Sequence, residues 1–318
     1  MVLILQYTKV KMDSETRVIQ EKMQNMKKRN KELHQTSEMI IEDKRGYEIR
    51  KVSPLERLLH EFTSFSREKN MIWAQAEADV TEALQKLREY KEKTGESISF
   101  TAFIITVFAH VVAMHKYPMN SLIRKNKEIY TFDDVDVMTN IERTMEDGSK
   151  RPVSYTFRKA HKKTLKQISN ELREAQKVKQ VTATSTEGKK RWIQRVVKRL
   201  PYYPKFIRYF LLRLMFNNPM LKKQAMGTVN VTAIGMFGTG MGKMIHVTPH
   251  ALSLGIGGME KLPFNVDGKV MNRDLVGMTL AMDHSVIDGA PATRFFHDFR
   301  EHLMYFCHDA DWCFKSLE

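Results

Sequence analysis

A histidine lies between a strand-like and a helix-like segment in the stretch from Ala281 to Ala290. The residues before it, 275–282, alternate larger apolar side chains with smaller or polar ones, which is typical of a strand buried on at least one face. His284 can take up or release a proton near neutral pH, and Asp288, four residues further on, can orient the imidazole or brace its loop. This spacing predicts a general base, although a pattern this short also suits a structural histidine.

The segment after the histidine is predicted to be an amphipathic helix that opens at Ala290 and Pro291. Its apolar residues recur at helical spacing: Phe295, Phe296, Phe299, Leu303 and Phe306. Gly289 is expected to let the backbone turn sharply between the strand and this helix. A loop between two packed elements is a suitable place for a base.

Four stretches around this junction resemble, in the right order, the acyltransferase component of 2-oxo acid dehydrogenase complexes, and more loosely chloramphenicol acetyltransferase. They are the active-site signature Asp283–Ala290, the strand and glycine turn Gly227–Gly238, the buried strand Ala251–Gly258 and the hairpin Asn265–Lys269. Several ordered matches are far more specific than one short motif. The resemblance is firm over about 227–306 and weaker over about 50–179. It is absent before residue 50 and in the stretch 188–226.

The resemblance implies an α/β (α+β) two-layer sandwich, with a mixed β-sheet packed by helices and chains assembled as homotrimers or multiples of trimers. It also implies an active site between subunits and acyl transfer to or from coenzyme A. By the family pattern, His284 is the general base and the hydroxyl of Thr232 donates to the oxyanion of the tetrahedral intermediate. Asp288 is expected to hold the loop by pairing with an arginine, for which Arg57 is the candidate. Taken without the resemblance, Thr232 is an ordinary strand residue.

The acyl acceptor stays open between a dihydrolipoyl thiol on a separate carrier, which the resemblance implies, and a hydroxyl or amine of a small molecule or lipid. The sequence shows nothing like the lipoyl and subunit-binding modules of the family, and no Asp-Lys-Ala lipoylation site. A third alternative is a non-catalytic, membrane-associated trimeric scaffold. The intact His284 and Asp288 pattern and the hydroxyl at Thr232 argue for retained catalysis.

Upstream of the junction, helices and strands are expected to alternate, which is typical of a layered α/β or α+β domain. A helix should begin at Pro54 with Ser53 as its cap. We further predict helices from Thr81 to about Gly95, from Thr101 to Met114 and from Thr164 to Lys179, and strands at Met71–Val80, Glu128–Tyr130, Val135–Ile141 and Arg151–Phe157. Residues 101–114 are strongly apolar and contain no helix breaker, which indicates a buried helix.

The charge of the chain points to an anionic partner: the formal net charge is +15, over 318 residues of which 42% are hydrophobic. Nucleic acid, an acidic membrane surface and a phosphorylated ligand such as coenzyme A all fit. The stretch from Gly188 to Gly227 holds eleven Lys and Arg residues and no Asp or Glu. Its basic, aromatic and helically spaced residues suit an anionic membrane surface, or else helices that cover the core and the acyl site. Nucleic acid is disfavoured, because no fold that binds it is recognised.

The domains are predicted as a charged helical extension at 1–48, a catalytic domain at 49–306 with the basic aromatic insertion at 188–226, and a tail at 307–318. The composition of Asp13–Arg45 favours a solvated helix, which either extends freely or contacts another subunit. No metal is expected, since Cys307, His308 and Cys313 lack the paired spacing of zinc sites. The absence of a signal peptide or spanning segment predicts a cytoplasmic protein, with peripheral membrane association as the alternative.

Overall fold

The computed structural model describes residues 40–43, 47–124, 127–144, 150–177, 199–233, 242–266 and 268–304. Two compact units are distinguished: Met1–Ser53 with Met145–Lys150, and Pro54–Thr144 with Arg151–Glu318. In the first unit, strand β1 (Ile40–Asp43) pairs antiparallel with β2 (Tyr47–Arg50). The helix predicted over Asp13–Arg45 is therefore wrong at its end, where the β-branched pair Ile40 and Ile41 favours a strand. The rest of that predicted helix lies outside the described residues.

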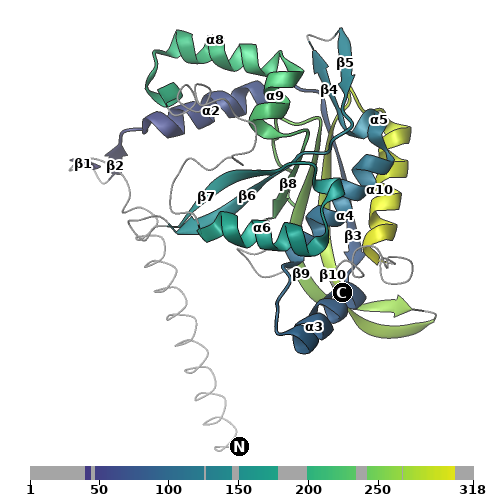
Figure 1. Ribbon diagram of the computed structural model, residues 1–318. Coiled ribbons are helices and arrows are strands. Elements are labelled where there is room, and N and C mark those ends of the chain that lie inside the picture. The colour runs from purple at the N-terminus through teal and green to yellow at the C-terminus, as the bar shows by residue number, and fades with distance from the viewer. Residues whose placement is uncertain are drawn as a thin grey trace, which may run out of the picture. The chain divides into compact units, whose positions relative to one another are not determined.

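The second unit is built on a six-stranded mixed sheet (Figure 1). In order across the sheet its strands are β3 (Met71–Asp79), β10 (Lys269–Asp283), β9 (Leu252–Val266), β8 (Val229–Ala233), β6 (Val137–Thr144) and β7 (Lys150–Phe157). Strand β8 runs parallel to β6 and β9, whereas β10 runs antiparallel to β9 and β3. A separate antiparallel pair is formed by β4 (Ser121–Arg124) and β5 (Glu128–Thr131). The predicted mixed sheet is confirmed.

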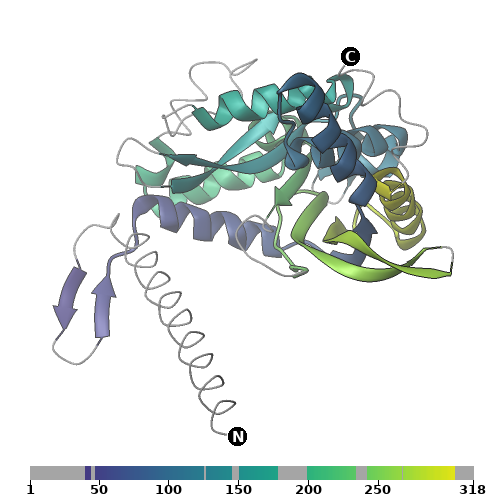
Figure 2. The ribbon, with the colours of Figure 1, turned by 90° about the horizontal axis from the view of Figure 1, so that it is seen from below.

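The second unit also contains helices. They are α2 (Pro54–Arg67), α3 (Thr81–Thr94), α4 (Phe100–Met114), α5 (Lys116–Met119), η1 (Ala160–Lys162), α6 (Leu165–Lys177), η2 (Leu200–Tyr202), α8 (Lys205–Phe216), α9 (Pro219–Met226) and α10 (Gly289–Met304). The views in Figures 1 and 2 place α4, α6 and α10 on one face of the sheet. α2 and α8 lie against each other. Every helix predicted between residues 53 and 177 is present, and α2 begins at Pro54 as expected.

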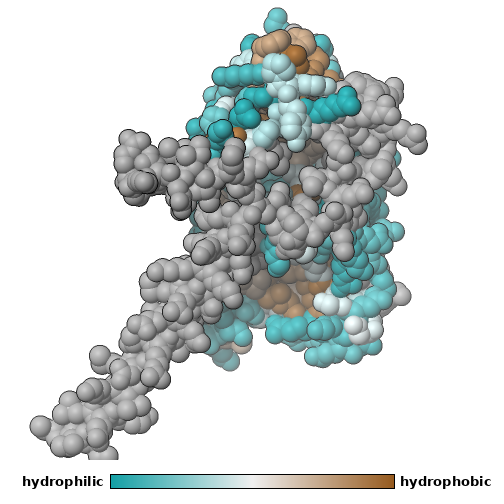
Figure 3. All heavy atoms as spheres, turned by 90° about the vertical axis from the view of Figure 1, so that its left-hand side faces the viewer, coloured by the Kyte–Doolittle hydropathy of each residue, from teal (hydrophilic) through white to brown (hydrophobic). Residues whose placement is uncertain are grey.

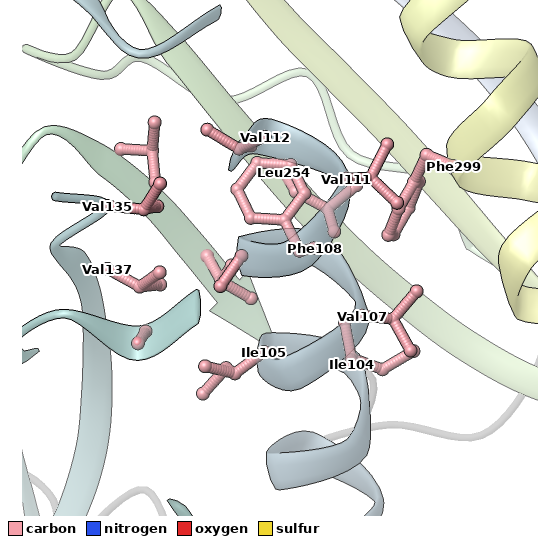
Figure 4. Close-up of a cluster of buried hydrophobic side chains, with 14 of the residues drawn as sticks. Ile104, Ile105, Val107, Phe108, Val111, Val112, Val135, Val137, Leu254 and Phe299 are labelled. Atoms are coloured by element: carbon pink, nitrogen blue, oxygen red, sulfur yellow. The ribbon is translucent and has the colours of Figure 1, made fainter. Parts of the chain in front are cut away.

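Helix α4 is the centre of the core. Its residues from Ala102 to Val112 are buried almost without exception, because both the sheet and α10 pack against it. Figure 4 shows Val135 and Val137 on one side of the helix and Phe299 on the other. The rings of Phe108 and Phe299 meet edge to face with centroids 5.5 Å apart. A helix that is apolar on nearly all sides is typically buried in this way. None of the described helices is long and apolar enough to span a membrane.

The hairpin that joins β9 to β10 brings the chain back to the histidine. Its turn is the predicted one: Gly268 adopts a φ of +80°, and its N–H donates to the Oδ1 of Asn265 at 2.9 Å. β10 is longer than expected. The prediction missed its first part, because residues 269–272 are all exposed and lack the alternation that indicates a half-buried strand. β6 begins at Val137, two residues after the predicted start. The pairing of β10 with β9 fixes where the histidine emerges from the sheet.

Candidate functional site

Backbone hydrogen bonds close the turn that carries His284. The carbonyl of Asp283 accepts from the N–H groups of Val286 and Ile287, each at 2.9 Å, and the N–H of His284 donates to the carbonyl of Asn70 at 2.8 Å. The side chains of Val286 and Ile287 are buried in the core. The histidine therefore stands on a turn whose backbone is held from both sides, while its own side chain is 49% exposed.

Gly289 does not make the turn. Among the described glycines, φ is positive at Gly95, Gly227 and Gly268, and Gly289 is the first residue of α10, with open space where a Cβ would lie. The predicted need for a flexible glycine at this point is wrong. The direction of the chain changes over residues 284–287 instead, and the Asp283 carbonyl stabilises that change.

Asp288 lies between the histidine and the first turn of α10. Its Oδ1 accepts from the N–H of Gly289 at 2.7 Å and lies 3.8 Å from Nε2 of His284. That distance is too long for a hydrogen bond, yet the carboxylate attracts the imidazole once the ring is protonated. Asp288 can therefore stabilise an imidazolium while it holds the start of the helix.

The predicted pairing of Asp288 with Arg57 is absent from the described ion pairs. Arg57 is an exposed residue of α2, and the side chain of Asp288 is 83% exposed. The described partners of the Asp288 carboxylate are the amide of Gly289 and the neighbouring imidazole.

Thr232 lies far from His284 within one chain. It pairs with Gly255 across β8 and β9, whereas Met282, two residues before the histidine, pairs with Leu252 across β10 and β9. Two strand spacings of about 4.8 Å and about five residues of rise at 3.3 Å put the two Cα atoms roughly 19 Å apart. A single chain therefore does not bring the proposed base and the proposed oxyanion donor to one reacting atom.

A buried polar cluster, which the sequence analysis did not predict, lies beside Thr232. Ser253 Oγ lies 2.7 Å from Nε2 of His246 and accepts from Nδ2 of Asn230 at 2.9 Å. The ring of His246 packs on Gly255, where an added Cβ would lie 2.9 Å from Nδ1. Burial lowers the pKa of His246, which keeps its imidazole neutral. Finding this cluster from sequence would require the register that sets Asn230 opposite Ser253.

A groove of about 410 Å³ begins at the histidine turn. Met282 and Gly289, on either side of the turn, line one end of it, and the rest runs between β3 and α10. Trp73 and Phe296 supply apolar walls, and His297 and Arg300 supply polar groups. The groove can thus hold a mainly apolar ligand between β3 and the start of α10, the helix that follows the histidine turn.

No group of three metal-binding side chains occurs in the part of the chain that the structure describes. The residues weighed for a metal, Cys307, His308 and Cys313, lie outside that part, as do the tail and residues 188–198 of the insertion. The glycine turn predicted after Thr232 is also outside it from residue 234 to 241.

Residues 219–307 match the family described as 2-oxoacid dehydrogenases acyltransferase (catalytic domain). The lipoamide acyltransferase component of the branched-chain alpha-keto acid dehydrogenase complex of Bacillus subtilis is 26% identical over 70% of this chain and 44% of its own length. The succinyltransferase component of the 2-oxoglutarate dehydrogenase complex of Saccharomyces cerevisiae is 31% identical over 24% of this chain and 16% of its own length. The chain thus spans less than half of the length of either relative.

Solved structures share the fold over most of the chain. A probable dihydrolipoamide acetyltransferase of Listeria monocytogenes matches 84% of this chain and 99% of its own, with a TM-score of 0.58 and 18% identity. The cubic core of a pyruvate dehydrogenase multienzyme complex matches 85% and 97%, with a TM-score of 0.57 and 18% identity. The dihydrolipoamide acetyltransferase of Azotobacter vinelandii matches 84% and 96%, with a TM-score of 0.57 and 19% identity.

In the Azotobacter vinelandii protein, a serine, a histidine and an asparagine have been studied for their role in the catalytic mechanism. Sequence similarity over 219–307 and the shared two-layer fold agree with the resemblance of the four motifs. The resemblance of this chain to the acyltransferase catalytic domain of 2-oxo acid dehydrogenase complexes is therefore confirmed.

Proposed function

We propose that this chain is an acyltransferase that moves an acyl group between coenzyme A and a dihydrolipoyl thiol on a separate carrier. The observation that carries the proposal is the placement of His284: a half-exposed imidazole next to a carboxylate, on a braced turn between two elements, β10 and α10, that both line an apolar groove. A base of this kind needs exposure to reach its substrate and a rigid backbone to hold its geometry.

The separations between functional residues support the individual roles. In the Azotobacter vinelandii enzyme the serine lies 52 residues before the histidine, and the asparagine lies four residues after it. The same separations lead in this chain from His284 back to Thr232 and forward to Asp288. Threonine keeps the hydroxyl of serine, and aspartate keeps an oxygen acceptor and adds a charge.

These residues suffice for thioester exchange. His284 takes the proton of the attacking thiol, whose sulfur forms a bond to the thioester carbonyl carbon. The hydroxyl of Thr232 donates to the oxygen that becomes negative, which can lower the barrier by about 3 kcal/mol. The original carbon–sulfur bond then breaks, and the leaving thiolate takes the proton from His284. Asp288 stabilises the imidazolium that exists between the two proton transfers.

The working unit of this mechanism contains at least two copies of the chain, and a homotrimer is the proposed assembly. The separation of roughly 19 Å between Thr232 and His284, estimated from strand spacings, excludes their joint action within one copy. Two neighbours in a closed ring can each supply one of the residues at every interface. The cubic core of the pyruvate dehydrogenase complex, with the same fold, is a symmetric assembly.

Release of free coenzyme A tests the function directly. The purified chain is supplied with short acyl-CoA donors and a panel of acceptors: dihydrolipoamide, small hydroxyl compounds and amines. Release that depends on dihydrolipoamide supports the proposal, whereas release that depends only on a hydroxyl or amine would replace the acceptor. A correctly folded protein that releases nothing with any pair would leave the scaffold alternative in place.

Helix α8 supplies a specific observation in favour of a second role, attachment to an anionic membrane surface. Phe206, Phe210 and Leu214 recur every four residues along one stripe and are 74%, 66% and 48% exposed. Exposed Lys205 and Arg213 flank the stripe, and residues 199–226 contain no carboxylate. In Figure 3, apolar and hydrophilic atoms lie side by side at the upper end of the face shown. Apolar side chains next to cations suit the interface of an acidic bilayer.

The opposite side of α8 is firmly packed, so the stripe is presented on a rigid helix. Arg208 is buried and binds both carboxylate oxygens of Glu61, at 2.6 and 2.9 Å. The ring of Phe216 stacks on that of Phe65 with centroids 5.2 Å apart, and Leu212 is buried. The alternative role of this segment, as a helix that only covers the core, therefore accounts for the packed side of α8 but not for its exposed apolar stripe.

We expect the double substitution Phe206→Asp and Phe210→Asp to lower binding to acidic vesicles at least ~100-fold, because each buried aromatic side chain contributes about 2 kcal/mol. The folded state should be unaffected, since both side chains are exposed in the chain itself. Co-sedimentation with acidic and neutral vesicles measures binding, and Val270→Asp, at a residue 74% exposed on the β9–β10 hairpin, is the matched control. Equal binding of the double variant and the unsubstituted chain would exclude α8 as the membrane surface.

A further inference from the structure

Three buried ionisable side chains lie directly behind the histidine turn. Nζ of Lys69, in the connection from α2 to β3, lies 2.7 Å from Oδ2 of Asp283, and their side chains are 12% and 3% exposed. Lys222 of α9 is 5% exposed and interacts with both of them. Neither lysine has a part in the proton transfers proposed for His284. Burying two lysines next to one carboxylate is costly, which calls for a function.

Asp283 connects this cluster to His284, the proposed base. Its Oδ1 accepts from the N–H of Ser285 at 3.1 Å, in addition to the two amides that its carbonyl accepts. Asn70, the neighbour of Lys69, accepts from the N–H of His284 and donates from Nδ2 to Oγ of Ser285 at 3.0 Å. The Lys69–Asp283 ion pair therefore links the two chain segments that hold the backbone around His284, namely the connection before β3 and the turn after β10.

The charges in the cluster are unequal. Burial, followed by the charge of Lys69, lowers the pKa of Lys222 well below its usual value, although Asp283 opposes the shift. Burial lowers the pKa of His250, which also faces the lysines, to about 3. The cluster thus places two lysine side chains and a neutral imidazole next to the side chain of Asp283, and burial favours the uncharged form of Lys222.

The amine of Lys222 can replace Lys69 if the ion pair is lost. Without Lys69, the charge that most opposes protonation of Lys222 is gone, and Asp283 then favours the ammonium form. The ring of Phe216, 5.7 Å from Nζ, can also stabilise that ammonium. Among the described residues, Lys69 is the ion-pair partner of Asp283 and Lys222 is a second basic side chain that interacts with its charge, so the loss of both is expected to leave the carboxylate without a cation.

We propose that Lys69 and Lys222 are positioning residues for His284, which act through the carboxylate of Asp283. The inference rests on the proposed acyl transfer, and it assigns the lysines to the placement of the base and not to substrate binding.

Turnover of single and double variants tests this positioning. Lys69→Met and Lys222→Met should each lower kcat only a few-fold, whereas the double variant should lose about 100-fold, the scale that a displacement of about 1 Å can cause. The KM for coenzyme A should stay the same, because the groove is unchanged. Adding Asp283→Asn to the double variant removes the unpaired charge, keeps the acceptor for Ser285 and should restore most of kcat. Lys166→Met, at an exposed ion pair with Glu96, is the control.

Two further measurements do not need activity, so a failure of the proposed function can be told apart from a failure of this inference. The ring resonances of His284 should move in the double lysine variant and return when Asp283→Asn is added. Because the pKa of Lys222 is lowered in the folded chain, the unfolded chain binds more protons between that pKa and about 10.5, and folding stability should rise with pH there. Lys222→Met should remove the part of that rise in the Tm profile, below about pH 10.5, that comes from this lysine.

Unmoved His284 resonances in a folded double variant, or a double variant no weaker than the single ones, would overturn the positioning role. A rise of Tm with pH in Lys222→Met equal to that of the unsubstituted chain would overturn the assignment of Lys222 as the amine in reserve.

Discussion

His284→Ala is expected to lower turnover at least ~100-fold, because removal of a general base leaves the attacking thiol without a proton acceptor. The fold should survive, since the turn is held by the backbone N–H of His284 and by the carbonyl and carboxylate of Asp283, none of which the substitution removes. kcat from the coenzyme A release assay measures the effect, and circular dichroism with sedimentation checks the fold and the assembly.

His60→Ala is the matched control, because His60 is an exposed histidine of α2. That variant should retain full turnover. Near-normal turnover in a purified His284→Ala variant would show that another group is the base, and the polar cluster of His246 and Ser253 would be the next candidate.

Thr232→Val is expected to lower kcat by about 100-fold, the scale found when one donor to an oxyanion is removed. Valine keeps the branched shape that suits the strand pairing of β8 with β9, so the loss can be assigned to the hydroxyl. Thr232→Ser should retain most of the activity because it keeps the donor. KM for coenzyme A should change little in both variants, since the ground-state thioester makes a weaker bond to this hydroxyl than the intermediate does.

Equal losses in Thr232→Val and Thr232→Ser would contradict the role of the hydroxyl and point to packing of the strand. If Thr232→Val were as active as the unsubstituted chain, Thr232 would be an ordinary strand residue without a role in catalysis.

Local patterns in the sequence were sufficient to predict most elements of the fold. Residues 101–114 are apolar on every side and form the buried helix α4, and the turn residues Asn265 and Gly268 form the predicted hairpin. Such features depend on neighbours in the chain, which periodicity and turn chemistry describe well. The position of His284 at the end of a strand was predictable for the same reason.

Residues that meet across the fold were not predictable in this way. Lys69 and Asp283 are 214 residues apart in the chain, and no local pattern pairs them. The pairing of Asn230 with Ser253 depends on the parallel register of β8 and β9. The expected ion pair between Asp288 and Arg57 is not among the described ion pairs, for a related reason. A sequence suggests which type of residue could be the partner, but it does not show toward which side of its helix that residue points.

The separation of Thr232 and His284 shows how register limits inference from a single sequence. Both residues were assigned from the family pattern, which also implies a site between subunits; the order of β8, β9 and β10 adds the separation of roughly 19 Å within one chain, which agrees with that implication. We therefore propose that assembly is a part of the mechanism.

The most direct test of the account is the activity of mixed assemblies. Chains with His284→Ala and chains with Thr232→Val, each carrying a different tag, are co-expressed, and assemblies with both tags are isolated and assayed for coenzyme A release. In a ring of three chains one interface of every mixed assembly pairs an intact His284 with an intact Thr232, so roughly a third of normal turnover is expected. Mixed assemblies as inactive as the two parents, or a fully active monomer of the unsubstituted chain, would contradict a site shared between copies.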